Sequence, residues 1–156
     1  MAFDLNHFTL EELPFVAFIC ELMGGVDTKN FKYPELEKEI FLNTGGITAD
    51  ILCMPIFNTK DKFTLKLVLS AKTTKENLNK MKELILELIL NSDFSSKQRI
   101  NEILQMTKSN YELKILQSGS TFAMMRLKSY YSVSGNINDF ISGIEYFKFI
   151  NNLEKE

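Results

Sequence analysis

The sequence predicts an α+β fold in which helices pack on one face of an antiparallel sheet. Residues 47–53 and 63–70 alternate apolar and polar side chains around a polar turn, which is typical of half-buried strands. Most other segments repeat apolar residues at the three- and four-residue spacing of amphipathic helices. Because strands and helices do not alternate regularly along the chain, an α+β class is favoured over a parallel α/β class.

The first segment combines a short strand with a helix. Phe3 to Leu5 reads as a strand, and such a strand ordinarily needs a neighbour to pair with. Thr9 to Glu12 is a capping-box pattern, and Pro14 indicates a helix start one or two residues later. Gly24-Gly25 ends this helix. The apolar residues expected to face inward are Phe15, Phe18, Ile19 and Leu22.

The central segment is a helix followed by the hairpin. Tyr33-Pro34 begins the helix, because proline at a first helical position loses no needed N–H. Asn43 to Gly46 ends it. Pro55 predicts that the first strand ends, bends or lies at a sheet edge, and residues 58–62 form the polar turn. The inward residues of the helix are expected to be Leu36, Ile40 and Phe41.

Helices are expected throughout the second half. Thr73 to Glu76 predicts a capping box for a helix that ends near Leu90. Ser95 or Ser96 caps the next helix, on which Lys97, Arg99 and Lys108 are interpreted as a solvent-exposed face. The inward residues of that helix are Ile100, Ile103, Leu104, Thr107, Tyr111 and Ile115.

The last third contains two predicted interruptions. Ser118 to Ser120 breaks the helical pattern, which resumes briefly over residues 122–127. Ser132 to Gly135 is predicted to be a second loop. A final helix then directs Phe140, Ile141, Ile144, Phe147 and Ile150 inward.

Composition excludes several function classes. The 156 residues carry a net charge of −2 with two arginines, so neither nucleic acid nor an anionic membrane is expected as a partner. No apolar run approaches the roughly 20 residues that span a bilayer, and no secretory signal is visible, which predicts a cytoplasmic location. Cys20 and Cys53 occupy core-like positions and are interpreted as buried thiols rather than a disulfide.

The candidate reactive residues do not form a catalytic pattern. His7 is the single histidine, and Glu11 and Glu12 are better explained as first-turn residues that compensate the helix dipole. A zinc site needs three or four ligands, mostly histidine and cysteine. Ser118 and Ser120 lack the G-x-S-x-G pattern and a nearby base. The sequence therefore predicts no catalytic, cofactor-binding or metal-ligating residue in this chain.

Two further motifs have structural explanations. Gly45-Gly46 follows a helix and precedes a strand, which is the reverse of a phosphate-binding loop, so it is interpreted as a helix stop. Met124-Met125 is interpreted as core packing, with a soft peptide-binding surface as the alternative.

A family resemblance extends the interpretation. The stretches Phe3 to Ile51 and Ser118 to Glu156 resemble zinc metallopeptidases of the pitrilysin/insulinase class, in the presequence-protease (falcilysin-like) branch. The run Tyr33 to Ile47, which ends in TGGI, is similar to the third domain of that branch. So is the later pattern of Ser118-Gly119, Tyr130-Tyr131-Ser132 and Gly143-Ile144-Glu145-Tyr146.

The resemblance implies a fold and a role. Family members contain four related α+β domains of the LuxS/mitochondrial-processing-peptidase-like fold, whose two halves enclose a chamber for short unfolded peptides. Zinc sits in the first domain on an H-x-x-E-H motif. That motif is absent here, and Arg126 with Tyr130 or Tyr131 only superficially resembles an arginine and tyrosine pair of the last domain.

Residues 1–156 would then be the non-catalytic third domain, incomplete at its N-terminus, of a zinc-dependent peptidase. The domain would form chamber wall and inter-domain surface, with the other domains and an unfolded peptide as partners, and the isolated chain would self-associate. A free-standing protein- or peptide-interaction module of the same fold is the main alternative. A self-sufficient enzyme that uses His7, Glu11, Glu12 and a serine is the third.

Overall fold

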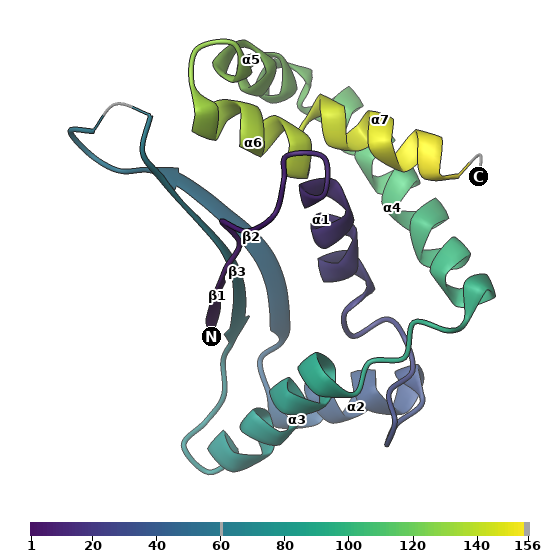
Figure 1. Cartoon of the computed structure of the whole chain (residues 1–156). Helices are drawn as coiled ribbons and strands as arrows, with labels where there is room; N and C mark the ends of the chain where they lie inside the picture. The colour runs from purple at the N-terminus through teal and green to yellow at the C-terminus, as the bar shows by residue number, and fades with distance from the viewer. Residues whose placement is uncertain (60, 155–156) are drawn as a thin grey trace.

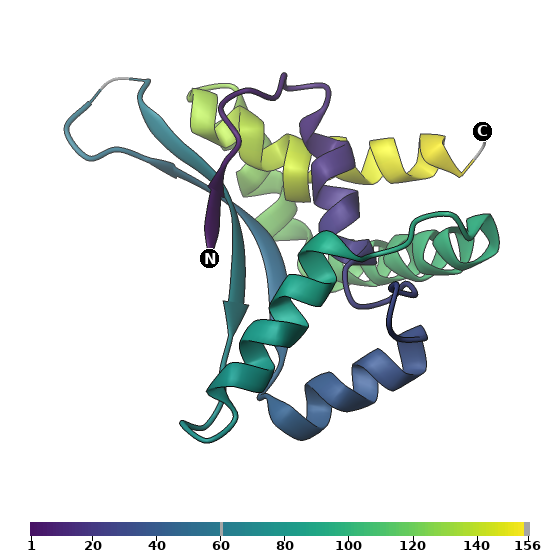
Figure 2. The same ribbon diagram turned by 60° about the horizontal axis from the view of Figure 1, so that its bottom comes forward.

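The computed structural model describes residues 1–59 and 61–154, and it has the α+β class expected from the sequence. Three antiparallel strands form a sheet of order β1-β3-β2, with β1 at Ala2–Asp4, β2 at Ile47–Pro55 and β3 at Phe63–Ala71. The helices gather on one side of this sheet (Figures 1 and 2). They are α1 (Leu13–Leu22), α2 (Tyr33–Asn43), α3 (Leu78–Leu90), α4 (Lys97–Gln117), α5 (Gly119–Ser129), α6 (Val133–Ser142) and α7 (Ile144–Leu153).

The hairpin has the predicted register and end point. β2 and β3 pair from Ile47 opposite Ala71 to Pro55 opposite Phe63, so β2 ends at its proline as expected. β2 is an edge strand, and α6 lies along that edge, where Asn138 Nδ2 donates to the Cys53 carbonyl at 3.3 Å. Covering the edge in this way satisfies a backbone group that would otherwise be open to another chain. Lys60, in the predicted turn, lies outside the described residues.

The main core lies between the inner sheet face and α1, α4, α6 and α7. Its buried members come from every one of these elements, and aromatic contacts tie α4 to α7 through Tyr111 and Tyr146, whose ring centroids lie 5.2 Å apart. A second, smaller cluster joins α2 to α3. The buried residues of that second cluster are Leu36, Leu84 and Leu88.

Two inward faces were predicted wrongly. On α1, Phe15 is 51% exposed and Ile19 is 40% exposed, because the helix buries the neighbouring face that carries Leu13 and Phe18. Phe15 still packs edge-on against Phe149. On α2, Phe41 is 82% exposed, because this helix packs mainly on α3 through a single fully buried leucine.

The predicted capping box at Thr73 is also wrong. α3 begins at Leu78, and the Thr73 hydroxyl donates to the Asn43 carbonyl at 2.8 Å instead of capping a helix. This bond ties the end of α2 to the exit of β3. The earlier box at Thr9 does form: Glu12 accepts from both the backbone N–H and the hydroxyl of Thr9, which lowers the pKa of the Glu12 carboxyl.

The cations of α4 form specific contacts rather than a purely solvated face. Ser96 caps the helix as predicted, accepting from the Arg99 N–H. The Arg99 guanidinium donates to the Gly25 carbonyl at 2.7 Å and lies 3.8 Å above the Tyr33 ring, so it joins α4 to the α1–α2 connection. Lys108 pairs with Glu154 at the end of α7. Only tertiary contacts distinguish these residues from ordinary surface cations.

The predicted loop at Ser132 to Gly135 is the start of α6. Ser132 caps that helix by accepting from the Gly135 N–H at 3.0 Å. The expected final helix is divided at Gly143, because Asp139 folds back to accept the Ile144 N–H at 2.9 Å and so caps α7. The division lets α6 pack on the sheet edge while α7 packs on α4.

Glu87 of α3 is a buried carboxylate that holds the loop before α2. It accepts from the backbone N–H of Asn30 at 3.1 Å, from the Asn30 side chain at 2.8 Å and from Asn91 at 2.6 Å. Burial raises the pKa of Glu87, but these hydrogen bonds, with one from Thr28, outweigh it and lower the pKa to about 2. The charged form is therefore favoured by folding.

We expect Glu87→Gln to destabilise the protein by about 2 kcal/mol at pH 7, because the new amide nitrogen would face donors. The folded pKa lies below the ordinary value of 4.5, so the contribution of Glu87 is complete above pH 4.5 and is lost as pH falls through about 2. Urea unfolding at pH 7 and near pH 2 measures this. Glu83→Gln, on the exposed side of the same helix, is the control. A difference that persists unchanged at low pH would contradict the role of the charge.

Candidate functional site

The residues singled out for chemistry do not come together. His7 is exposed in the loop after β1, and Glu12 serves the start of α1. Ser118 and Ser120 lie at the α4–α5 junction, far along the chain from any histidine. Within residues 1–59 and 61–154, no three His, Cys, Asp or Glu side chains are grouped so as to hold a metal ion.

The two thiols are buried to different degrees. Cys53 is buried on the inner sheet face, and Cys20 is half-buried on α1. Burial raises the pKa of Cys20 to about 12 and also raises that of Cys53, so neither is a nucleophilic thiolate near neutral pH. Both are free thiols, as expected.

A polar cleft of about 210 Å³ opens where α1, β2, α4 and α6 meet. Burial raises the pKa of Glu21, with Asp50 adding to the rise and Lys114 opposing it. The Lys114 ammonium lies 4.9 Å from the centre of the Tyr111 ring. These groups can hold a small polar group, but the cleft offers neither an activated nucleophile nor a neutral-pH base. The cleft is lined by Ala17, Cys20, Glu21, Ala49, Asp50, Ile51, Tyr111, Lys114, Ile141 and Ser142.

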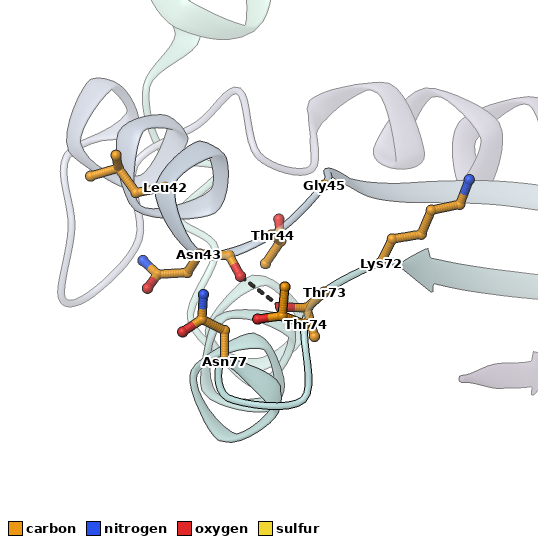
Figure 3. A pocket seen from close by; sticks show the side chains of 8 residues that line it. All are labelled: Leu42, Asn43, Thr44, Gly45, Lys72, Thr73, Thr74 and Asn77. Carbon is orange, nitrogen blue, oxygen red and sulfur yellow. Dashed lines mark hydrogen bonds between the residues drawn. The ribbon is translucent and has the colours of Figure 1, made fainter.

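A second hollow, of about 380 Å³, lies where the end of α2 meets the exit of β3 (Figure 3). The bond from Thr73 to the Asn43 carbonyl crosses it, and Gly46, with φ +107°, lets the chain turn into β2. The Lys72 side chain extends away from Thr73 and Asn77 (Figure 3). No cation therefore points into the hollow, which agrees with a structural role for the glycine pair.

The Arg126 side chain lies in an ion-pair network at the junction of α5, α6 and α7. Its guanidinium donates to Asp139 at 2.5 Å and lies 2.7 Å from Glu145. It also lies 5.3 Å from the centre of the Tyr130 ring, whereas Tyr131 is 86% exposed. Asp139 is fully buried, so Arg126 has a structural task, and its pKa is raised further by the Asp139 hydrogen bond. The pairing with Tyr130 arises from this packing.

Exposed apolar side chains mark the outer helical layer. Met106, Leu113 and Leu116 lie on the side of α4 that faces away from the core, and Leu116 is 82% exposed. Met124 of α5 is 55% exposed, so the interpretation of both methionines as core packing is wrong for it, while Met125 is half-buried. Apolar surface of this kind is typical of interfaces. Sequence analysis missed the α4 residues because the helix also has a normal inward face.

Within the described residues, none of the helices combines the length and hydropathy that a bilayer-spanning segment needs.

Comparisons with known proteins agree with the sequence resemblance. A family model for the region associated with peptidases of subfamily C of metallopeptidase family 16 matches residues 1–153. The chain is 30% identical to Protein HypA of Clostridium perfringens over 154 residues, which cover 99% of this chain and 16% of that protein. It is 27% identical to the mitochondrial presequence protease of Yarrowia lipolytica over 143 residues, 92% of this chain and 14% of the relative.

A third relative is a plant protein. The chain is 24% identical to presequence protease 1, chloroplastic/mitochondrial, of Arabidopsis thaliana over 156 residues, 100% of this chain and 14% of the relative. The chain thus spans only 14–16% of the length of these curated relatives.

Proposed function

The chain belongs to this peptidase-associated family, and from this premise we propose that it is a non-catalytic domain of a longer zinc-dependent peptidase that degrades short unfolded peptides. One observation carries the proposal: the family match covers residues 1–153, while the relatives named presequence protease are about seven times longer than the matched region. In this proposal residues 1–156 form one domain of the parent.

The chemistry belongs to another domain of the parent. The described residues do not fit zinc, because they provide no group of three suitable ligands, and no reaction step is assigned to them. The raised thiol pKa values and the isolated position of His7 are consistent with a domain that binds without reacting.

The contribution of this domain is surface. The outward apolar side chains of α4 and α5 support a role in contacts with other domains of the parent and in the wall of a peptide chamber. The arrangement of helices on one face of an antiparallel sheet supports the LuxS/mitochondrial-processing-peptidase-like fold for the complete domain. Self-association of the isolated chain through the same apolar surface stays a prediction.

The location of the protein also stays a prediction. The relatives from Yarrowia lipolytica and Arabidopsis thaliana are named for mitochondria and chloroplasts, whereas the sequence of this chain predicts a cytoplasmic location.

We expect the isolated 156-residue chain to show no hydrolysis of an unfolded peptide, with or without added zinc, and an unchanged unfolding midpoint after chelator treatment. A fluorogenic peptide assay and thermal unfolding measure these outcomes. Zinc-dependent cleavage by the chain, after contaminating protease is excluded, would overturn the non-catalytic assignment.

An immunoblot of native source-cell lysate tests the parent directly. A band several times larger than 18.0 kDa is expected, and its purified full-length protein should cleave the same peptide in a zinc-dependent way. A band at 18.0 kDa would instead favour the free-standing interaction module.

A further inference from the structure

An apolar groove of about 620 Å³ lies between the end of β3 and the first turns of α3. Leu69 and Ile85 are almost fully buried at its base, whereas Met1 is 59% exposed and Leu86 is 49% exposed at its rim. The groove is lined by Met1, Leu69, Ser70, Ala71, Met81, Lys82, Ile85 and Leu86.

The backbone beside this groove has unused hydrogen-bonding capacity. Odd-numbered β3 residues bond towards β1: Leu65 accepts from Leu5, and Leu69 exchanges bonds of 2.9 and 2.8 Å with Met1. Even-numbered residues bond towards β2, as Lys72 does with Gly46. Ala71 is the next odd residue, so its N–H and C=O point to the β1 side. Pairing with β1 stops at Met1, and these two groups have no strand partner among the described residues.

The register fixes what would fit there. Residues directly opposite each other in antiparallel strands share one face of the sheet, and Ala71 shares the inner face with Leu69. A residue aligned with Ala71, in line with β1, would therefore direct its side chain into the groove over Met81 and Ile85. A residue aligned with Ser70 would face outward. The site accepts an extended segment that is apolar at the first position and polar at the second.

We propose that this groove receives a β-strand from another part of the parent peptidase, paired antiparallel to β3 in line with β1. The occupant rests on the proposed function: the relatives are much longer than this chain, and a segment of the same polypeptide is present at high effective concentration. Strand addition satisfies Ala71, and the groove supplies the side-chain pocket that such pairing uses for specificity.

Amide hydrogen exchange at Ala71 tests the proposal. We expect the Ala71 amide to exchange at least about tenfold more slowly in the full-length parent than in the isolated chain. Ser70 is the internal control, because its N–H faces β2 and should be protected in both proteins. Equal exchange at Ala71 would overturn the proposal, and protection that appears in the isolated chain only at high concentration would assign the groove to a second copy.

A matched pair of proline variants separates docking from folding. Ala71→Pro removes only the outward N–H and should leave the unfolding midpoint of the isolated chain nearly unchanged, whereas Ser70→Pro breaks a β2–β3 bond and should lower it. In the full-length parent, Ala71→Pro should lower the midpoint as well. No effect in the parent would contradict strand addition, whereas a native band of 18.0 kDa would instead defeat the proposed function itself.

Discussion

Replacing Gly135 with alanine is expected to destabilise the protein by about 3 kcal/mol, which places it among the most damaging single-methyl additions in the chain. A Cβ at this position would lie 2.4 Å from the Lys128 carbonyl oxygen and 2.7 Å from the Ser132 hydroxyl oxygen. The first is backbone of the last turn of α5, and the second is the cap of α6. Neither can retreat cheaply, because moving them opens the α5–α6 junction.

Urea unfolding monitored by circular dichroism measures this loss. Gly119→Ala is the matched control, because a Cβ at Gly119 meets nothing within 4 Å at the start of α5, and alanine there should stabilise the helix by up to about 1 kcal/mol. Equal stability of the Gly135 variant and the unmodified protein would show that α5 and α6 are not packed as described. The two variants differ only in surroundings, so helix propensity cannot explain a difference of sign.

Gly135 also shows where sequence analysis reached its limit. Serine and glycine in a row are typical of a loop, and the sequence offered no sign that a neighbouring backbone lies against this glycine. The hairpin was predictable because its alternation is local, and β3 does begin and end within one residue of the expected range. Close approach between helices is a tertiary property, and it changes the meaning of a residue without changing the pattern around it.

The same distinction applies to the surfaces. Phe41 and Met124 were assigned inward from apolar spacing, yet both are exposed, because spacing reports that a face is apolar and not what covers it. The absence of a catalytic pattern could be predicted from residue types, since chemistry needs particular side chains. The open backbone groups of Ala71 could not, because they follow from the register of β1 on β3, which no local pattern encodes.

Removing the Asp139 carboxylate by Asp139→Ala is expected to cost about 3–5 kcal/mol, the range for breaking a buried ion pair by losing one partner. Asp139 is 0% exposed, accepts from Arg126 at 2.5 Å and caps α7 through the Ile144 N–H. The alanine variant leaves a guanidinium with only Glu145 as its acid partner and leaves the first turn of α7 without its cap.

Chemical denaturation of three variants apportions that cost. Asp139→Asn can keep an acceptor for Ile144 while losing the charge, so it should fall between Asp139→Ala and the unmodified protein. Glu145→Ala is the control, because this carboxylate shares Arg126 but keeps more solvent contact and should cost about 1 kcal/mol or less. A Glu145→Ala loss as large as that of Asp139→Ala would move the centre of the network to the surface. The expected order instead makes Asp139 the residue that fixes α5 relative to α7, and with it the position of the exposed side chains of α5 that the parent peptidase is proposed to cover.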